Sequence, residues 1–102
     1  MIDLVEKNLE SIRGLCRRYG VTRLGLIGSA ATGRFNSTRS DLDFVVEFAA
    51  STGRGLDSPY FRLLLDLEDL LGVKVDLIEL PAVRRASFLE RVKLEEVRLY
   101  AA

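Results

Sequence analysis

The segment LIGSAATGRFNSTRSDLDFVVEF, residues 26–48, joins two apolar runs through a polar stretch. The first run ends at Gly28-Ser29, and the second begins within Asp41-Leu42-Asp43. Short apolar runs bounded by small and polar residues are typical of buried strands. We therefore expect strands over residues 21–27 and 42–48, with two acids at the start of the second.

The remaining elements follow from the same periodicities. Apolar residues at spacings of three and four predict helices, and the stretch from 59 begins with a proline that suits a first helical turn, capped by Ser58 or Asp57. We expect helices over 3–19, 59–72 and 83–94, a third strand over 73–80, and either a strand or a fraying helix end over 97–100. This order predicts a single α/β (α+β) domain over residues 1–102, with a small mixed sheet and helices mainly on one face.

The composition excludes several classes of function. The 15 basic and 15 acidic residues cancel, so no excess of positive charge favours nucleic acid or an anionic membrane as a partner, and no apolar run is long enough to span a bilayer. The absence of histidine removes Ser-His-Asp and Cys-His chemistry and zinc sites of the histidine type. The one cysteine, Cys16, cannot form an internal disulfide, so we expect a core thiol and a cytoplasmic protein.

Three acids are candidates for a metal site. Asp41 and Asp43 are alternate residues of one strand, so their side chains share a face, and Asp76 interrupts the apolar residues of the third strand. If the two strands pair, the three carboxylates lie together and suit a hard cation such as Mg²⁺. For the first two acids the alternative is a cap and a solvated start of a strand. For Asp76 it is a satisfied polar residue, or a salt bridge to Lys74 or an arginine.

A turn at Gly28 and Ser29 precedes the acids in the chain. A tight turn that leads into a helix presents backbone N–H groups, and these together with a serine hydroxyl can bind phosphate. A lone Gly-Ser pair is usually only a turn, but in combination with the acids it predicts a phosphate site that faces a metal site.

Taken together, these residues resemble the nucleotidyltransferase motif of the DNA polymerase beta superfamily. The small size is similar to that of the minimal nucleotidyltransferase (MNT) domains, which are the antitoxin partners of HEPN toxins. The similarity covers nearly the whole chain, although the spacer over residues 30–40 is one residue longer than is typical of the antitoxin group. It implies the fold of the polymerase beta palm.

The resemblance also implies roles for individual residues. Asp41 and Asp43 would hold two magnesium ions, and Asp76 would bind the catalytic ion and receive the acceptor's proton. Ser29 and the backbone near Gly28 would bind the β- and γ-phosphates of ATP. Two arginines of the spacer, Arg34 and Arg39, could also reach phosphate, or could be solvated loop residues.

A chain of this length leaves no room for an acceptor-binding domain, so we expect a protein acceptor. The resemblance implies transfer of AMP to a tyrosine of a HEPN RNase toxin, encoded by an adjacent gene, as the means of silencing it. Two alternatives stay open: an antitoxin that neutralises by binding alone, and a stand-alone transferase for a small-molecule hydroxyl. The leucines of residues 63–71 fit either core packing or a protein interface.

Overall fold

A computed structural model of the chain describes residues 2–32, 41–50, 53 and 55–102. Its four strands form one mixed sheet in the order β3-β2-β1-β4. The strand β1 (Val21–Ile27) runs antiparallel to β2 (Leu42–Phe48) and to β4 (Val97–Ala101), whereas β3 (Val75–Glu79) runs parallel to β2. The mixed sheet and the two strands of the opening segment are therefore confirmed, and the C-terminal residues form a strand.

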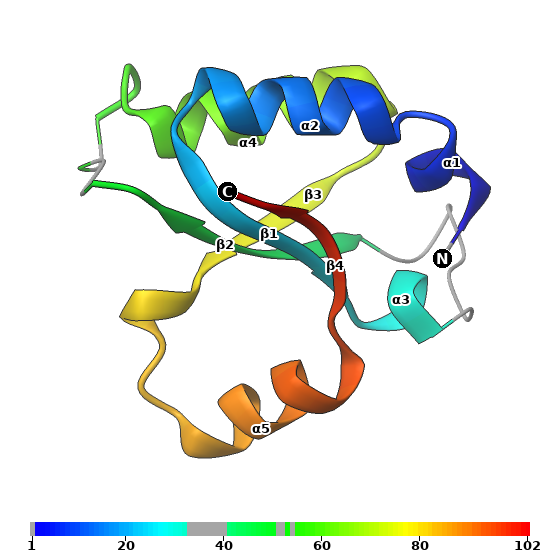
Figure 1. Cartoon of the computed structure of the whole chain (residues 1–102), viewed down its shortest axis with the longest axis vertical. Coiled ribbons are helices and arrows are strands. Elements are labelled where there is room, and N and C mark those ends of the chain that lie inside the picture. The colour runs from blue at the N-terminus through cyan, green and yellow to red at the C-terminus, as the bar shows by residue number, and fades with distance from the viewer. Residues whose placement is uncertain (1, 33–40, 51–52, 54) are drawn as a thin grey trace.

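The two faces of the sheet carry different helices (Figure 1). The helices α2 (Leu9–Arg18) and α4 (Pro59–Leu71) cover one face, where they enclose the main core with Leu42, Phe44 and Val46 of β2. The helix α5 (Ala86–Glu95) lies on the other face, where its Val92 packs against a smaller cluster. Because side chains alternate along β2, Asp43 shares this second face with α5.

The N-terminal helix differs from the prediction. The expected single helix over 3–19 is broken into α1 (Asp3–Glu6) and α2, with the break at Lys7 and Asn8. The Asn8 side-chain amide donates a hydrogen bond to the Leu4 carbonyl at 2.8 Å. An asparagine side chain competes in this way for backbone groups, which explains why the apolar periodicity alone did not show the break.

The later elements are also shorter than predicted. The third strand begins at Val75 and ends at Glu79. It ends there because Leu80, Pro81 and Ala82 form a short 3₁₀ helix, η1 (Leu80–Ala82). The final helix starts at Ala86. The predicted cap of α4 is confirmed, since the Ser58 hydroxyl accepts a hydrogen bond from the Phe61 N–H at 3.3 Å. The leucines of α4 serve mainly the core: Leu63, Leu67 and Leu71 are buried, and Leu65 is exposed.

An ion cluster around the buried carboxylate of Glu96 joins the end of α5 to the sheet. The Glu96 carboxylate, only 6% exposed, pairs with Arg23 of β1 and with Arg98 of β4. Burial by itself raises the pKa of Glu96, but the hydrogen bonds and charges of these two arginines together outweigh it and lower the pKa below its ordinary value. The carboxylate lies directly over Gly25, where a Cβ atom would come within 2.0 Å of its Oε2 atom. A side chain at this position of β1 would displace the Glu96 side chain, so the packing favours glycine here.

We predict that Gly25→Ala lowers the free energy of unfolding by about 1–3 kcal/mol, because the added methyl group displaces Glu96 from its two arginines. Urea denaturation measures this change. Gly14→Ala in α2 is the matched control: a Cβ there meets nothing within 4 Å, and we expect it to stabilise the helix by ~0.5–1 kcal/mol. A Gly25→Ala variant as stable as the wild type would contradict this assignment.

Candidate active site

Two of the three predicted acids are direct neighbours across a pair of parallel strands. Asp43 of β2 is the register partner of Asp76 of β3, and on its other side Asp43 pairs with Ile27 of β1. Neighbouring strands lie about 4.8 Å apart, and register partners point to the same face. The sheet therefore places both carboxylates on the face that carries α5. The expected convergence of these strands is confirmed.

The third acid, Asp41, lies just before β2 and is exposed, as is Asp76, whereas Asp43 is half-buried. The predicted salt-bridge alternative for Asp76 is not found: no ion pair links it to Lys74 or to any other described cation. As the side chains stand, no three acidic or cysteine residues within the described ranges are grouped closely enough to hold a metal ion. The three acids share a face without forming a closed set of ligands.

The charges of Asp41 and Asp76 nevertheless act on Asp43. Burial, followed by the charges of Asp76 and Asp41, raises the pKa of Asp43 above its ordinary value, while Arg91 opposes the shift. Three carboxylates with this little compensation repel one another, and a bound cation would relieve that repulsion. Exposed Asp41 and Asp76 can rotate toward such an ion. The oxygen ligands available here therefore fit a hard divalent cation.

The turn at Gly28 lies directly against Asp43. Gly28 has a φ of +74°, and a Cβ atom built on it would come within 2.7 Å of the Asp43 Oδ2 atom. Both the left-handed backbone and the close carboxylate thus require glycine. The short helix α3 (Ser29–Thr32) follows Gly28 at once in the chain. The chain therefore brings the predicted phosphate turn and the predicted metal ligands into one place.

Two residues of α5 that the sequence analysis did not single out also reach this place. The Arg91 Nη2 atom lies 3.7 Å from the same Cβ position on Gly28. The Gly28 N–H donates a hydrogen bond to the Glu95 Oε1 atom at 3.3 Å, and the Arg91 Nε pairs with Glu95 at 3.2 Å. Only the i, i+4 spacing of Arg91 and Glu95 marked them in the sequence, and such pairs are common on exposed helices.

The nucleotidyltransferase domain family matches residues 9–100. The chain belongs to this family. The nucleotidyltransferase is 36% identical over 80 residues to Putative protein adenylyltransferase MJ1379 of Methanocaldococcus jannaschii, a match that covers 71% of this chain and 78% of the relative.

Two solved structures have a similar fold. One, described as a putative minimal nucleotidyltransferase, is 36% identical, with a TM-score of 0.76 over 94% of this chain and 95% of the other. The second is a tri-AMPylated Shewanella oneidensis HEPN toxin in complex with MNT antitoxin, matched at 21% identity and a TM-score of 0.68 over 95% of this chain and 72% of that one. At that identity the second likeness concerns the fold alone. The nucleotidyltransferase therefore shares the minimal architecture.

The two arginines of the spacer, Arg34 and Arg39, lie outside the described residues. Their predicted contacts with phosphate stay predictions. The single cysteine of the nucleotidyltransferase, Cys16, is buried as expected, and burial raises its pKa to about 12, so it is an inert core thiol. None of the described helices has the length and apolar character needed to cross a membrane.

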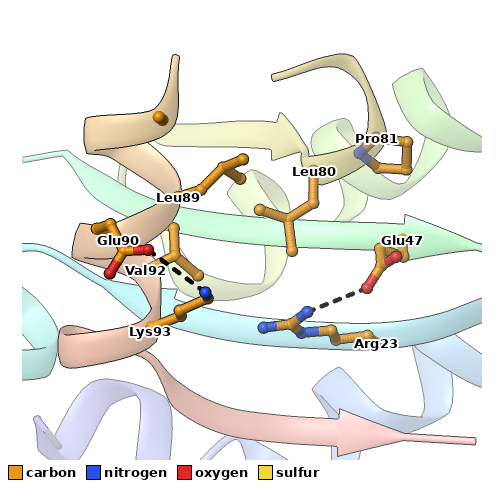
Figure 2. Close-up of a pocket in the computed structure, with 9 residues that line it drawn as sticks. Arg23, Glu47, Leu80, Pro81, Leu89, Glu90, Val92 and Lys93 are labelled. Atoms are coloured by element: carbon orange, nitrogen blue, oxygen red, sulfur yellow. Dashed lines mark hydrogen bonds and ion pairs between the residues drawn. The ribbon is translucent and has the colours of Figure 1, made fainter. Parts of the chain in front are cut away.

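A separate pocket of about 420 Å³ lies on the sheet face that carries α5, between α5 and residues of β1, β2 and η1. Figure 2 shows Leu80, Leu89 and Val92 around it, with ion pairs from Arg23 to Glu47 and from Lys93 to Glu90. None of the predicted site residues lines it. Its charged groups are already paired with one another.

The raised pKa of Asp43 predicts a pH-dependent cost to stability. Below the ordinary value of 3.8 the carboxyl is protonated in both states and costs nothing; as the pH rises through the folded-state pKa the charged form is penalised, and the cost is complete above it. In the absence of divalent cations, Asp43→Asn should therefore raise the Tm at pH 7 by roughly 2–4 °C, and this gain should shrink toward zero on acidification.

Calorimetric scans from pH 3 to pH 8 measure the effect. Glu6→Gln, at an exposed acid of α1, is the control and should change the Tm much less. A gain for Asp43→Asn that is absent at pH 7, or that grows at low pH, contradicts the described environment of Asp43.

Proposed function

We propose that this nucleotidyltransferase is an antitoxin that transfers AMP from ATP to a tyrosine of a HEPN toxin, encoded by an adjacent gene, and so neutralises it. The observation that carries the proposal is the pairing of Asp43 with Asp76 beside the Gly28 turn. Two relatives support it: the M. jannaschii protein is named a protein adenylyltransferase, and the S. oneidensis structure joins an MNT antitoxin to an AMPylated HEPN toxin. A cytoplasmic setting is part of the proposal.

The acids suit a pair of magnesium ions, for which Asp41, Asp43 and Asp76 would supply the carboxylate ligands. When bound, Mg²⁺ neutralises the triphosphate and makes the acceptor hydroxyl more acidic. The fit rests on the donor set and on the negative charge around Asp43, which Arg91 offsets only in part. Hard cations are commonly held in this way, between carboxylates and the phosphates of a substrate.

The other residues position the nucleotide. In our proposal the Gly28 backbone and the Ser29 hydroxyl bind the β- and γ-phosphates, which sets the α-phosphate over Asp43 and Asp76. Positioning and neutralisation supply most of the catalysis in phosphoryl-type transfers, because the protein has little covalent chemistry to do. The closeness of Gly28 to the Asp43 carboxylate supports this placement.

The transfer step involves one bond made and one broken. The tyrosine oxygen attacks the α-phosphorus and forms a new P–O bond, and the bond from the α-phosphorus to the oxygen that bridges the α- and β-phosphates breaks. Pyrophosphate leaves with that electron pair, and the tyrosine proton passes to the carboxylate of Asp76. The exposed position of Asp76 at the edge strand β3 makes it accessible to a protein acceptor.

We predict that Asp43→Asn and Asp76→Asn each lower AMP transfer by at least ~10³-fold while the fold is retained, because each removes a ligand charge at the reacting phosphate. Labelled AMP on the partner toxin measures transfer, and circular dichroism checks the fold. Glu79→Gln is the matched control, since Glu79 lies in the same strand as Asp76 but alternates to the opposite face. Retained activity in Asp43→Asn would contradict the metal assignment.

Mass spectrometry of the partner distinguishes the proposal from its alternatives. Incubation with ATP, Mg²⁺ and the toxin should add the mass of AMP to a tyrosine. A stable complex without added mass would instead support neutralisation by binding alone. No interaction with the toxin would leave a small-molecule hydroxyl as the acceptor.

A further inference from the structure

The helix α5 places a cationic side chain, Arg91, and an anionic side chain, Glu95, at the Gly28 turn. Val92, which is 3% exposed, anchors the helix in the cluster that contains Ile27 and Val45. Arg91 and Glu95 flank this anchor at a spacing of one helical turn, and both reach toward Gly28. Their positions are therefore fixed by the packing of α5 on the sheet.

Glu95 holds a donor that the proposed function assigns to phosphate. Its Oε1 atom accepts the hydrogen bond of the Gly28 N–H at 3.3 Å, and its side chain is 28% exposed. A carboxylate oxygen and a phosphate oxygen are both anionic acceptors, so they satisfy the same backbone N–H. Glu95 and a triphosphate therefore cannot both have this hydrogen bond in its present geometry.

Arg91 is placed to bind the phosphate that would replace the carboxylate. Its guanidinium lies 3.7 Å from the Cβ position of Gly28 and acts electrostatically on Asp43. At present its Nε contacts both oxygens of Glu95 at 3.2 Å, and its side chain is 48% exposed, so a ligand can reach it. The planar fork of an arginine binds phosphate as readily as carboxylate.

We propose that Arg91 binds the triphosphate of the nucleotide and that Glu95 competes with the triphosphate for Arg91 and for the Gly28 N–H. The inference rests on the proposed function and deepens it. In the nucleotide-free protein Glu95 neutralises Arg91; when the nucleotide enters, its phosphates take both donors and Glu95 turns toward solvent. Glu95 thus sets how much nucleotide is needed to fill the site.

Titration calorimetry with a non-hydrolysable ATP analogue and Mg²⁺ tests the exchange. Arg91→Ala should weaken binding of the analogue by about 10-fold or more, and should affect adenosine far less, because adenosine lacks the phosphates. Glu95→Ala should tighten binding by roughly 5-fold, because the competing acceptor is gone.

Two controls match the changes of charge. Arg17→Ala removes an exposed arginine from α2 on the other face, and Glu90→Ala removes an exposed acid from α5 itself; both should bind the analogue like the wild type. Binding that is unchanged in Arg91→Ala, or unchanged or weaker in Glu95→Ala, overturns the inference. Failure of the wild type to bind the analogue overturns the proposed function instead, so the two failures are distinguishable.

Discussion

Two carboxylates that face each other across parallel strands repel, and in this fold the register of β2 with β3 holds Asp43 and Asp76 in that arrangement. Asp43 and Asp76 are fixed as partners by the same hydrogen bonds that align Leu42 with Val75 and Phe44 with Leu77 in the core. A one-residue slip would relieve the repulsion, but it would turn those buried side chains toward solvent. The core thus stabilises an unfavourable concentration of charge, as expected where a protein binds a cation and phosphates.

The residues around Asp43 and Asp76 accommodate this concentration of negative charge. Gly28 lacks a side chain where Asp43 approaches, and Arg91 supplies the positive charge that partly offsets the acids. A pocket of about 420 Å³ also opens on this face, beside Arg23 and Glu47, but those two charged residues already pair with each other. Membership of the nucleotidyltransferase family agrees with chemistry at the acids.

The sequence predicted much of this arrangement because its strongest signals are local. Period-two alternation put Asp41 and Asp43 on one face, and the apolar runs located β1 and β2. The pairing of β2 with β3 could not be predicted in the same way, since register depends on contacts between distant segments. Arg91 and Glu95 were missed for the same reason: their role comes from how α5 docks on the sheet. The break at Asn8 was missed because a side chain, not the apolar pattern, determines it.

In our proposal, the three acids and the Gly28 turn form one site for a cation and a triphosphate. Crystals grown with Mn²⁺ and a non-hydrolysable ATP analogue, measured at the manganese absorption edge, locate both ligands. We expect an anomalous peak at coordination distance from the carboxylates of Asp43 and Asp76, with the phosphates on Gly28 and Ser29. Manganese and nucleotide bound elsewhere, such as in the pocket beside Arg23 and Glu47, with the acids unliganded, would contradict it.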